Sequence, residues 1–336
     1  MGLVEHDAKK WIDYRDPVFK LYGVNHQFER LPAEVAKKVN PGVGRLYRDP
    51  AGGRIRFSTD SKTIAVRAQV ARCKGVGFDL FRLEDEQEVF AAGFRRTECF
   101  ICEGVFESRW VNVSEGTELI PYTLNLPYIG TLTGLEIGID ADARLETGVP
   151  YRNEKPVVFY GSSITQGAWA SRPGSSYISL ISQRYNLHYL NLGFAGSAKG
   201  EQAIADYMAE LDMCAFVCDY DHNAESPEKL METHLPLYQT IRKSHPDIPY
   251  IMITRPDFMF GDREENLRRI EVVRNTYEYA QEVGDKNVTF VDGSTLLEGD
   301  YYYNCTRDGV HPNDLGFYRM ASKIGPVIER EVVSRL

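Results

Sequence analysis

The sequence contains no long hydrophobic run. Its apolar stretches have the length of single strands, whereas about 18 apolar residues are needed to span a bilayer as a helix. The N-terminal stretch MGLVEHDAKKWIDYRD also lacks the apolar centre of a signal peptide. We therefore expect no membrane partner and no export of the chain in this form, and the sequence predicts a cytoplasmic protein.

A block of basic residues is also absent. The 39 lysines and arginines are outnumbered by 48 aspartates and glutamates, and charges of both signs are scattered along the chain. Proteins that bind DNA or RNA usually concentrate lysine and arginine in a patch or stripe. We therefore expect no nucleic-acid partner, while the charge pattern leaves open whether the chain forms a homo-oligomer.

The cysteines are few, and their spacing does not suit a metal site. Among the six cysteines, only Cys99 and Cys102 form a CxxC pair. A structural zinc site usually combines two such pairs, or one pair with closely spaced histidines. Neither arrangement is present, so the sequence predicts no structural zinc. We also expect no disulfide framework, because such bridges are rare in reducing compartments.

Two patterns divide the 336 residues near Val149 and Pro150, and two domains are usual for a chain of this length. Residues 1–150 contain short runs in which apolar and polar residues alternate, separated by clusters of Gly, Asp, Asn and Pro. This pattern is typical of antiparallel strands and predicts a β-sandwich. The expected strands are Arg54–Val70, Gly77–Leu83, Val89–Arg95, Thr117–Leu126 and Leu135–Ile139.

In residues 151–336, short apolar strands alternate with amphipathic helices. The expected strands are Val157–Tyr160, Tyr189–Leu192, Ala215–Asp219, Tyr250–Thr254 and Val288–Val291. The expected helices are Ser176–Tyr185, Gln202–Leu211, Glu228–His245, Glu264–Val283 and Asn313–Leu336. Pro236 and Pro326 should kink or break two of them. The alternation predicts an α/β domain whose parallel sheet is covered by helices on both faces.

The first candidate for chemistry follows the first strand of this α/β half. In open parallel sheets, ligands bind at the C-terminal ends of the strands. The segment GSSITQG begins there with Gly161, which permits a tight turn and places Ser163 near the start of the next segment. It is neither a GxSxG elbow, nor a phosphate-binding loop, nor a dinucleotide-binding fingerprint. Taken alone, it is more typical of an ordinary turn between strand and helix than of a nucleophile.

Two further strand ends carry groups that could stabilise an oxyanion. The second strand ends in NLGFAGS, where the backbone N–H of Gly196 could approach a ligand oxygen. The third ends in DYDHN, where the side-chain amide of Asn223 is a neutral donor. Glycine and asparagine are also common in turns, so neither segment is decisive alone.

The segment DGVHPN, just before the last expected helix, is the sharpest signal. Its Asp308 and His311 are three residues apart and can face the same serine. His311 could remove the proton of Ser163, while Asp308 would orient the imidazole and stabilise its charged form. Alone, the segment could also be a simple helix start. Four such segments at the edge where α/β sites form favour a serine hydrolase.

Together, these segments resemble the sequence blocks of the SGNH/GDSL hydrolase superfamily. GSSIT is similar to the first block, usually written GDS; NLGFAGS and DYDHN are similar to the second and third; and DGVHPN is similar to the DxxHP block. This resemblance spans about Lys155–Leu336. In the first half, GFDLF at Gly77–Phe81 resembles the GxDLY motif of a β-sandwich module that precedes this type of hydrolase.

The resemblance implies a flavodoxin-like three-layer α/β/α catalytic domain in residues 151–336, after a jelly-roll-like sandwich in residues 1–150. It implies that no metal or organic cofactor is used. The implied nucleophile is Ser163, the base is His311 and its orienting acid is Asp308. The implied oxyanion hole consists of the N–H groups of Ser163 and Gly196 and the side chain of Asn223.

The sequence departs from the family pattern in two places. Ser162 stands where the first block usually has Asp, and Ala224 follows Asn223 where Asp is usual. The second departure falls directly beside Asn223, and His222 on its other side is a rival base.

The implied activity is hydrolysis of short-chain esters, acetyl esters above all, with carbohydrates among the candidate alcohols. Two alternatives stay open from the sequence. The same Ser-His-Asp triad could transfer the acyl group to an acceptor other than water. The chain could also be a carbohydrate-binding protein whose hydrolase half is inactive.

Overall fold

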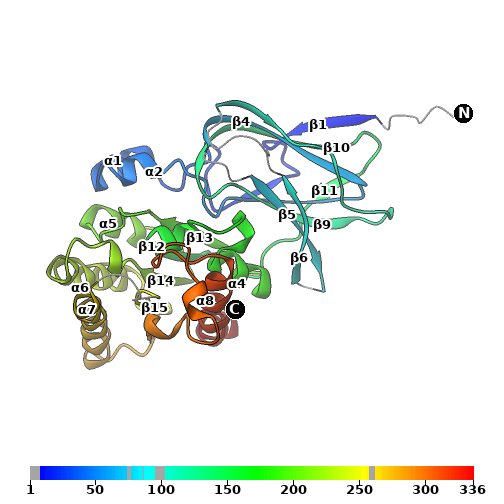
Figure 1. Cartoon of the computed structure of the whole chain (residues 1–336). Helices are drawn as coiled ribbons and strands as arrows, with labels where there is room; N and C mark the ends of the chain where they lie inside the picture. Colours follow the sequence, from blue (N-terminus) through cyan, green and yellow to red (C-terminus); the bar gives the residue numbers. More distant parts are fainter. Residues whose placement is uncertain (1–7, 74–76, 86, 95–102, 257–261) are drawn as a thin grey trace, which may run out of the picture. The chain divides into compact units, whose positions relative to one another are not determined.

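The computed structural model describes residues 8–73, 77–85, 87–94, 103–256 and 262–336. The chain divides into two compact units, drawn in one view in Figure 1. The N-terminal unit consists of Met1–Glu29, Arg48–Pro150 and Arg172–Gly174. The C-terminal unit consists of Arg30–Tyr47, Tyr151–Ser171 and Ser175–Leu336. The Cys99–Cys102 pair lies outside the described residues.

Two antiparallel sheets make up the N-terminal unit. One has the strand order β1-β10-β4-β7 with β8 beside β4; the other has the order β11-β3-β9-β5-β6 with β2 beside β3. The strands of the first sheet are β1 (Lys9–Asp13), β4 (Thr63–Cys73), β7 (Gly104–Glu107), β8 (Val111–Asn112) and β10 (Gly130–Asp140). Those of the second are β2 (Lys20–Tyr22), β3 (Arg54–Thr59), β5 (Phe78–Glu84), β6 (Gln87–Phe94), β9 (Ile120–Asn125) and β11 (Leu145–Thr147).

One hydrophobic core joins the two sheets. Ile55 and Phe57 of the second sheet and Ile137 and Ile139 of the first are fully buried in the same cluster. Because side chains alternate between the two faces of a strand, residues two positions apart share the buried face. The sandwich predicted from the alternating pattern is confirmed.

The expected strand Arg54–Val70 is divided in the structure. It forms β3 and β4, which lie in different sheets. The Asp140 carboxylate stabilises the connection, accepting hydrogen bonds from the backbone N–H groups of Lys62 at 2.8 Å and Thr63 at 3.2 Å. The alternating pattern continues through both strands, and for this reason the turn between them left no clear signal in the sequence.

Asp79 of the GFDLF segment is fully buried in β5. Its carboxylate accepts hydrogen bonds from the Asn125 side chain at 2.9 Å and from the backbone N–H of Gly174 at 2.8 Å. Burial raises the pKa of Asp79 to about 6, although these hydrogen bonds and the nearby Arg172 oppose the rise. The motif therefore places a buried carboxyl group with a raised pKa in the N-terminal unit.

A five-stranded parallel sheet forms the centre of the C-terminal unit. Its order is β13-β12-β14-β15-β16, which is the 2-1-3-4-5 order of flavodoxin-like folds. The strands are β12 (Val157–Gly161), β13 (Tyr189–Gly193), β14 (Ala215–Asp219), β15 (Tyr250–Ile253) and β16 (Val288–Val291). Each predicted strand is found within one residue of its predicted end.

Helices cover both faces of this sheet, as the strand–helix alternation predicts. Val158 and Tyr160 pack with α5, α6 and α7, whereas Val157 and Phe159 pack with α4 and α8. Figure 1 shows the two groups of helices on opposite sides of the strands. The helices are α3 (Ser163–Gln166), α4 (Tyr177–Tyr185), α5 (Gln202–Ala209), α6 (Pro227–Ser244), α7 (Arg263–Glu282) and α8 (Asp314–Glu331). No helix of the described residues is both long and apolar enough to span a membrane.

The two prolines expected to disturb helices do not break them. Pro236 lies inside α6 and Pro326 inside α8. A proline removes one backbone hydrogen bond at a cost of roughly 3 kcal/mol, and tertiary packing of a buried face can exceed that cost. In α6 the buried side chains of Leu230, Leu237 and Ile241 lie on both sides of Pro236 and hold the helix on the sheet.

The segment Arg30–Tyr47 belongs to the C-terminal unit, although the sequence analysis assigns it to residues 1–150. It contains α1 (Ala33–Val39) and α2 (Val43–Leu46), which the sequence analysis did not predict. The buried side chains of Val39 and Val43 share a core with the sheet and α5. Both helices are shorter than the window over which helical periodicity can be recognised, and their apolar residues therefore gave no signal.

Candidate active site

Ser163 lies in a tight turn between β12 and α3. A Cβ atom at Gly161 would lie 2.2 Å from the Asp219 carbonyl oxygen and 2.1 Å from the Thr165 hydroxyl, so only glycine fits there. Ser162 caps α3 by accepting the Ile164 N–H at 3.1 Å. Ser163 is therefore the first residue of a helix at the C-terminal edge of the sheet.

The structure brings Ser163, His311 and Asp308 together across 148 positions of the chain. The Ser163 hydroxyl oxygen lies 2.9 Å from His311 Nε2, and His311 Nδ1 lies 2.7 Å from Asp308 Oδ2. With Nδ1–H donating to Asp308, the Nε2 lone pair faces the Ser163 hydroxyl. This is the geometry of a nucleophile, its base and the carboxylate that orients the base.

The Asp308 carboxylate is held in its ionised form. Its Oδ1 accepts the backbone N–H groups of Val310 at 3.1 Å and His311 at 2.8 Å. Partial burial raises the pKa of Asp308, but the hydrogen bonds from His311 and Val310 outweigh it, so the net pKa lies below the ordinary value. An anionic Asp308 therefore stays beside the imidazole at neutral pH.

The loop that carries Asp308 and His311 is closed on itself before α8 begins. Arg307 N–H donates to the His311 carbonyl at 2.9 Å, and Asn313 N–H donates to the Cys305 carbonyl at 2.9 Å. The Asn313 side chain then caps α8 by accepting the N–H groups of Leu315 and Gly316. The sequence DGVHPN thus ends one turn and starts one helix, and both fix the position of the imidazole.

Two backbone N–H groups near Ser163 have no hydrogen-bond acceptor among the described residues. These are the N–H of Ser163 itself, at the first position of α3, and that of Gly196, just after β13. Gly196 is exposed and has a φ of +64°, a conformation suited to glycine. β12 and β13 are neighbours in the sheet, so both donors lie at the same edge.

Asn223 follows β14, the other neighbour of β12. Its side-chain nitrogen donates one hydrogen bond to the Phe194 carbonyl at 3.1 Å. An amide group carries two hydrogens, so a second hydrogen remains for another acceptor. The contact fixes Asn223 against the loop that carries Gly196.

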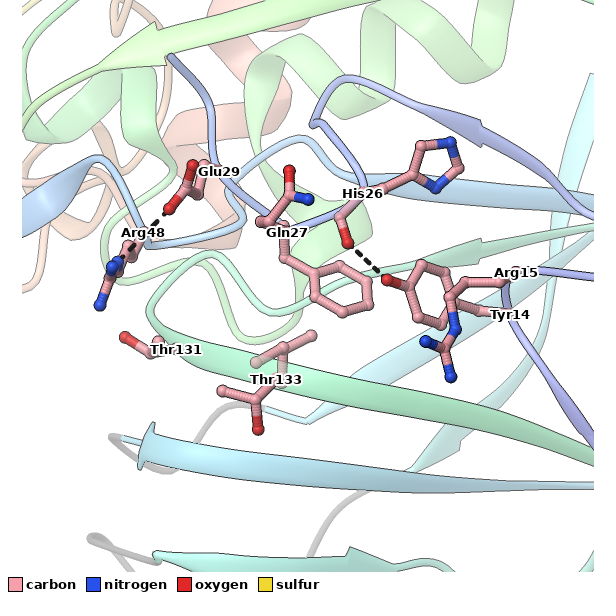
Figure 2. Close-up of a pocket in the computed structure, with 10 residues that line it drawn as sticks. Tyr14, Arg15, His26, Gln27, Glu29, Arg48, Thr131 and Thr133 are labelled. Atoms are coloured by element: carbon pink, nitrogen blue, oxygen red, sulfur yellow. Dashed lines mark hydrogen bonds and ion pairs between the residues drawn. The ribbon is translucent and has the colours of Figure 1, made fainter. Parts of the chain in front are cut away.

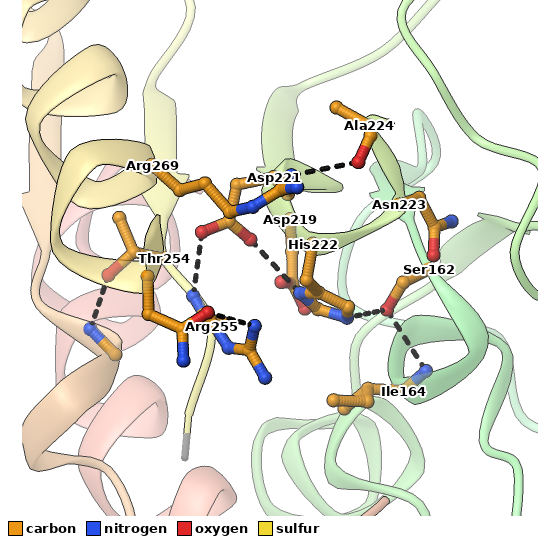
Figure 3. Close-up of polar contacts among 12 residues, drawn as sticks. Ser162, Ile164, Asp219, Asp221, His222, Asn223, Ala224, Thr254, Arg255 and Arg269 are labelled. Atoms are coloured by element: carbon orange, nitrogen blue, oxygen red, sulfur yellow. Dashed lines mark hydrogen bonds and ion pairs between the residues drawn. The ribbon is translucent and has the colours of Figure 1, made fainter. Parts of the chain in front are cut away.

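His222 does not lie on Ser163, so it is not the base for that hydroxyl in this structure. Its Nε2 lies 2.6 Å from the Ser162 hydroxyl, and its Nδ1 lies 3.0 Å from Asp221 Oδ1 (Figure 3). The molecule therefore has a second Ser-His-Asp chain beside the first, formed by Ser162, His222 and Asp221. Ser162 is fully buried, which keeps its hydroxyl away from solvent.

Hydrogen bonds stabilise the buried Asp221 carboxylate in its ionised form. Its Oδ2 accepts the Arg255 N–H at 3.1 Å, in addition to the bond from His222. Arg269 donates to the Asp221 carbonyl at 2.8 Å, and Figure 3 shows its bond to the Ala224 carbonyl, also 2.8 Å. Burial raises the pKa of Asp221, but the bond from His222 and the charges of His222 and Arg255 lower it below its ordinary value.

Asp219 lies beside this chain of hydrogen bonds and behaves differently. Burial and the charge of Asp221 raise the pKa of Asp219 well above its ordinary value. Carboxylate oxygens of Asp219 and Asp221 and a nitrogen of His222 lie within 4.8 Å of one another, a spacing compatible with a metal ion. Both nitrogens of His222 and both oxygens of Asp221 already hydrogen-bond within the protein, so we describe the group as a hydrogen-bond network.

Sequence reasoning missed two side chains that hold the Gly196 loop. Arg30 donates to the Gly193 and Asn191 carbonyls and stacks on the Phe194 ring, with its guanidinium carbon 4.4 Å from the ring centroid. Asn40 donates to the Ser197 carbonyl at 2.9 Å. Both come from Arg30–Tyr47, and no short motif marks them. By contrast, the replacement of Asp by Ser162 and the histidine beside Asn223 were visible signals of the second Ser-His-Asp chain.

A separate pocket of about 420 Å³ lies in the N-terminal unit (Figure 2). Tyr14 and His26 line it, and the Tyr14 hydroxyl donates to the His26 carbonyl at 2.5 Å. Glu29 and Arg48, also in its wall, form an ion pair at 3.5 Å. The Tyr14 hydroxyl and the Glu29 carboxylate thus bond within the wall of the pocket.

The chain is similar to known proteins over most of its length. Residues 154–329 match the GDSL-like Lipase/Acylhydrolase family, and residues 10–145 match the GxDLY family, described as the N-terminus of Esterase_SGNH_hydro-type. A protein described as a GDSL-like lipase from Bacteroides ovatus is 30% identical, with a TM-score of 0.85 over 96% of this chain and 98% of that one. No curated protein sequence matches significantly.

Two more distant structures share the fold. The salicylyl-acyltransferase SsfX3 from a tetracycline biosynthetic pathway is 20% identical, with a TM-score of 0.75 over 97% of each chain. A family two carbohydrate esterase from Clostridium thermocellum, solved with cellohexaose, is 14% identical, with a TM-score of 0.61 over 86% of this chain and 97% of that one. At these identities the likeness concerns the fold alone.

Proposed function

Because the chain belongs to the GDSL-like lipase/acylhydrolase family, we propose that it is a serine esterase with Ser163 as nucleophile, His311 as base and Asp308 as orienting acid. The observation that carries the proposal is the 2.9 Å contact between the Ser163 hydroxyl and His311 Nε2. Ser163 is 8% exposed, so the residue is largely shielded from water.

The proposed reaction has two steps. Ser163 Oγ attacks the ester carbonyl carbon while His311 Nε2 takes the hydroxyl proton, and the alcohol leaves with that proton. Water then attacks the acyl-enzyme, again giving its proton to His311, and the carboxylic acid is released as Ser163 is restored. The anionic Asp308 stabilises the imidazolium that forms in each step.

The tetrahedral intermediate requires donors for its oxyanion. The unpaired N–H groups of Ser163 and Gly196 and the second amide hydrogen of Asn223 are suited to this role. All three follow adjacent strands of the sheet. Removal of one such donor typically lowers the rate by about 100- to 1,000-fold.

The proposed substrates are short-chain esters, with acetyl esters of carbohydrates as the first candidates. Carbohydrate esterases that share the fold support the choice of carbohydrate esters, and this support rests on the fold alone. Transfer to an acceptor other than water uses the same triad, and an acyltransferase of the same fold makes this the second candidate. The Ser163–His311–Asp308 contacts weigh against an inactive, purely carbohydrate-binding protein.

The test is hydrolysis of p-nitrophenyl esters from acetate to octanoate, followed by acetylated sugars. Ser163→Ala should abolish turnover, whereas the matched variant Ser182→Ala should retain it, because the Ser182 hydroxyl bonds the Leu187 carbonyl near the opposite edge of the sheet. Wild-type turnover in Ser163→Ala would refute the proposal. Products formed with and without added alcohols distinguish hydrolysis from acyl transfer.

A further inference from the structure

A tryptophan borders the imidazole of His311. The ring centroids of Trp169 and His311 lie 6.5 Å apart at an interplanar angle of 69°, and Trp169 is 42% exposed. The Trp169 backbone has a φ of +73°. Residues other than glycine adopt this region at an energetic cost, and such residues are concentrated at functional sites. The chain therefore keeps a large exposed ring in an unfavourable conformation beside its catalytic base.

An arginine lies over this tryptophan. The guanidinium carbon of Arg307 is 3.9 Å from the centre of the Trp169 ring. The backbone N–H of Arg307 donates to the His311 carbonyl, so the arginine and the base belong to the same closed loop. The two distances from the Trp169 ring place the guanidinium within about 10 Å of the imidazole. Trp169 restricts the orientation of the charge through a cation–π contact.

The charge of Arg307 is not neutralised within the described part of the chain. Arg307 forms no ion pair with a carboxylate there. Its neighbour Asp308 uses both carboxylate oxygens on His311 and the backbone. Asp314, the next acidic residue along the chain, accepts the Ser171 N–H at 2.7 Å. A fixed and unpaired guanidinium beside a reaction centre is suited to hold an anion that arrives with the substrate.

We propose that Trp169 and Arg307 form a carboxylate-binding site, so that the preferred substrates are esters that also carry a carboxylate group. The proposal rests on the esterase function proposed above. Arginine suits this group because its planar fork of N–H donors matches the two oxygens of a carboxylate. The exposed part of the Trp169 ring provides apolar contact for the carbon chain between the carboxylate and the ester.

The experiment compares kcat/KM for matched esters with and without a carboxylate, using the full chain. The first pair is the p-nitrophenyl monoester of glutaric acid against p-nitrophenyl valerate, which places the charge on the acyl side. The second pair is O-acetyl-lactate against its amide, which places the charge on the alcohol side. The pair with the larger preference identifies the side of the ester that faces Arg307.

In Arg307→Gln, the preference for the charged ester should fall by about 10- to 100-fold, the range expected from loss of a hydrogen bond to a charged group. The neutral ester should change less than about threefold. Trp169→Phe should lower the preference partially. The matched control is Arg184→Gln, because Arg184 also stacks on an aromatic ring, that of Tyr185, but lies in the last turn of α4, away from the catalytic edge.

Equal loss of activity on both esters in Arg307→Gln, or a wild-type enzyme that does not favour the charged ester in either pair, would overturn the inference. Failure of the wild type to hydrolyse any ester would instead refute the esterase function. In that case, titration calorimetry with glutarate still tests the site: binding that weakens in Arg307→Gln and not in Arg184→Gln supports it, and equal or absent binding contradicts it.

Discussion

Ser162, His222 and Asp221 form a buried chain of hydrogen bonds. From this chain we predict that Asp221→Asn destabilises the wild type but stabilises a protein in which His222 is replaced by leucine. His222→Leu removes the partner of Asp221 Oδ1 and of the Ser162 hydroxyl while filling a similar volume. Asp221 is 1% exposed, so its charge would remain in the interior. The carboxylate would then keep the hydrogen bond from the backbone N–H of Arg255. Leaving a buried neutral group without its hydrogen-bond partner costs about 1–3 kcal/mol, and leaving a buried charged group without one costs more. We therefore expect His222→Leu to lower the free energy of unfolding by at least about 3 kcal/mol.

Asp221→Asn should then have opposite effects in two backgrounds. In the wild type it leaves one acceptor oxygen for two donors, His222 Nδ1–H and the Arg255 N–H, so one hydrogen bond is lost and the protein is destabilised. In the His222→Leu background it removes an unpaired buried charge and should stabilise the protein, with a coupling of about 1–3 kcal/mol between the two sites. Urea unfolding at pH 8 measures all four proteins of this cycle.

A control separates this effect from the general loss of a buried histidine. Burial lowers the pKa of His234 to about 4, so it is neutral at pH 8, and its Nδ1 lies 2.8 Å from the neutral Thr276 hydroxyl. His234→Leu should cost about 0.5–1.5 kcal/mol, the net value of one neutral hydrogen bond, because the Thr276 hydroxyl keeps its bond to the Val272 carbonyl. The reasoning is refuted if His222→Leu costs no more than His234→Leu, or if Asp221→Asn destabilises both backgrounds equally.

Three further predictions follow from individual contacts. Asn223→Ala should lower kcat for p-nitrophenyl acetate by about 100- to 1,000-fold if its free amide hydrogen meets the oxyanion, and a loss below tenfold would remove it from the oxyanion hole. Arg30→Met should lower kcat more than it raises KM, because the Gly193 carbonyl and the Gly196 loop lose their support; unchanged kcat would show that the loop keeps its position alone. Burial raises the pKa of Asp79 to about 6. Between about pH 4 and 6, the folded protein therefore holds a proton on Asp79 that the unfolded chain has released. The free energy of unfolding should fall by about 3 kcal/mol as the pH rises through this window. Asp79→Asn should remove that decrease in urea unfolding measured from pH 4 to 7, and an unchanged slope would contradict the raised pKa.

The sequence was sufficient to predict most of the catalytic half. The apolar strands of the parallel sheet are separated by long amphipathic helices, so their period and length both identify them. The position of Ser163 follows from this order, because Ser163 comes directly after β12. His311 lies in the long connection between β16 and α8, and only the DGVHPN motif identified it from the sequence.

Other features depend on contacts that no local pattern records. Arg30 and Asn40 contact the Gly196 loop through long-range hydrogen bonds to backbone carbonyls, and carbonyls are present in every residue. The stacking of Arg307 on Trp169 joins two loops far apart in the chain. Such pairs can be recognised only when the fold has brought the segments together.

The most direct test of the central claim is to locate the acyl-enzyme. After reaction with a fluorophosphonate, peptide mass spectrometry can distinguish the neighbouring hydroxyls of Ser162 and Ser163. We predict a single adduct on Ser163, which disappears in His311→Ala and persists in His222→Gln. An adduct on Ser162, or labelling that depends on His222 instead of His311, would contradict it.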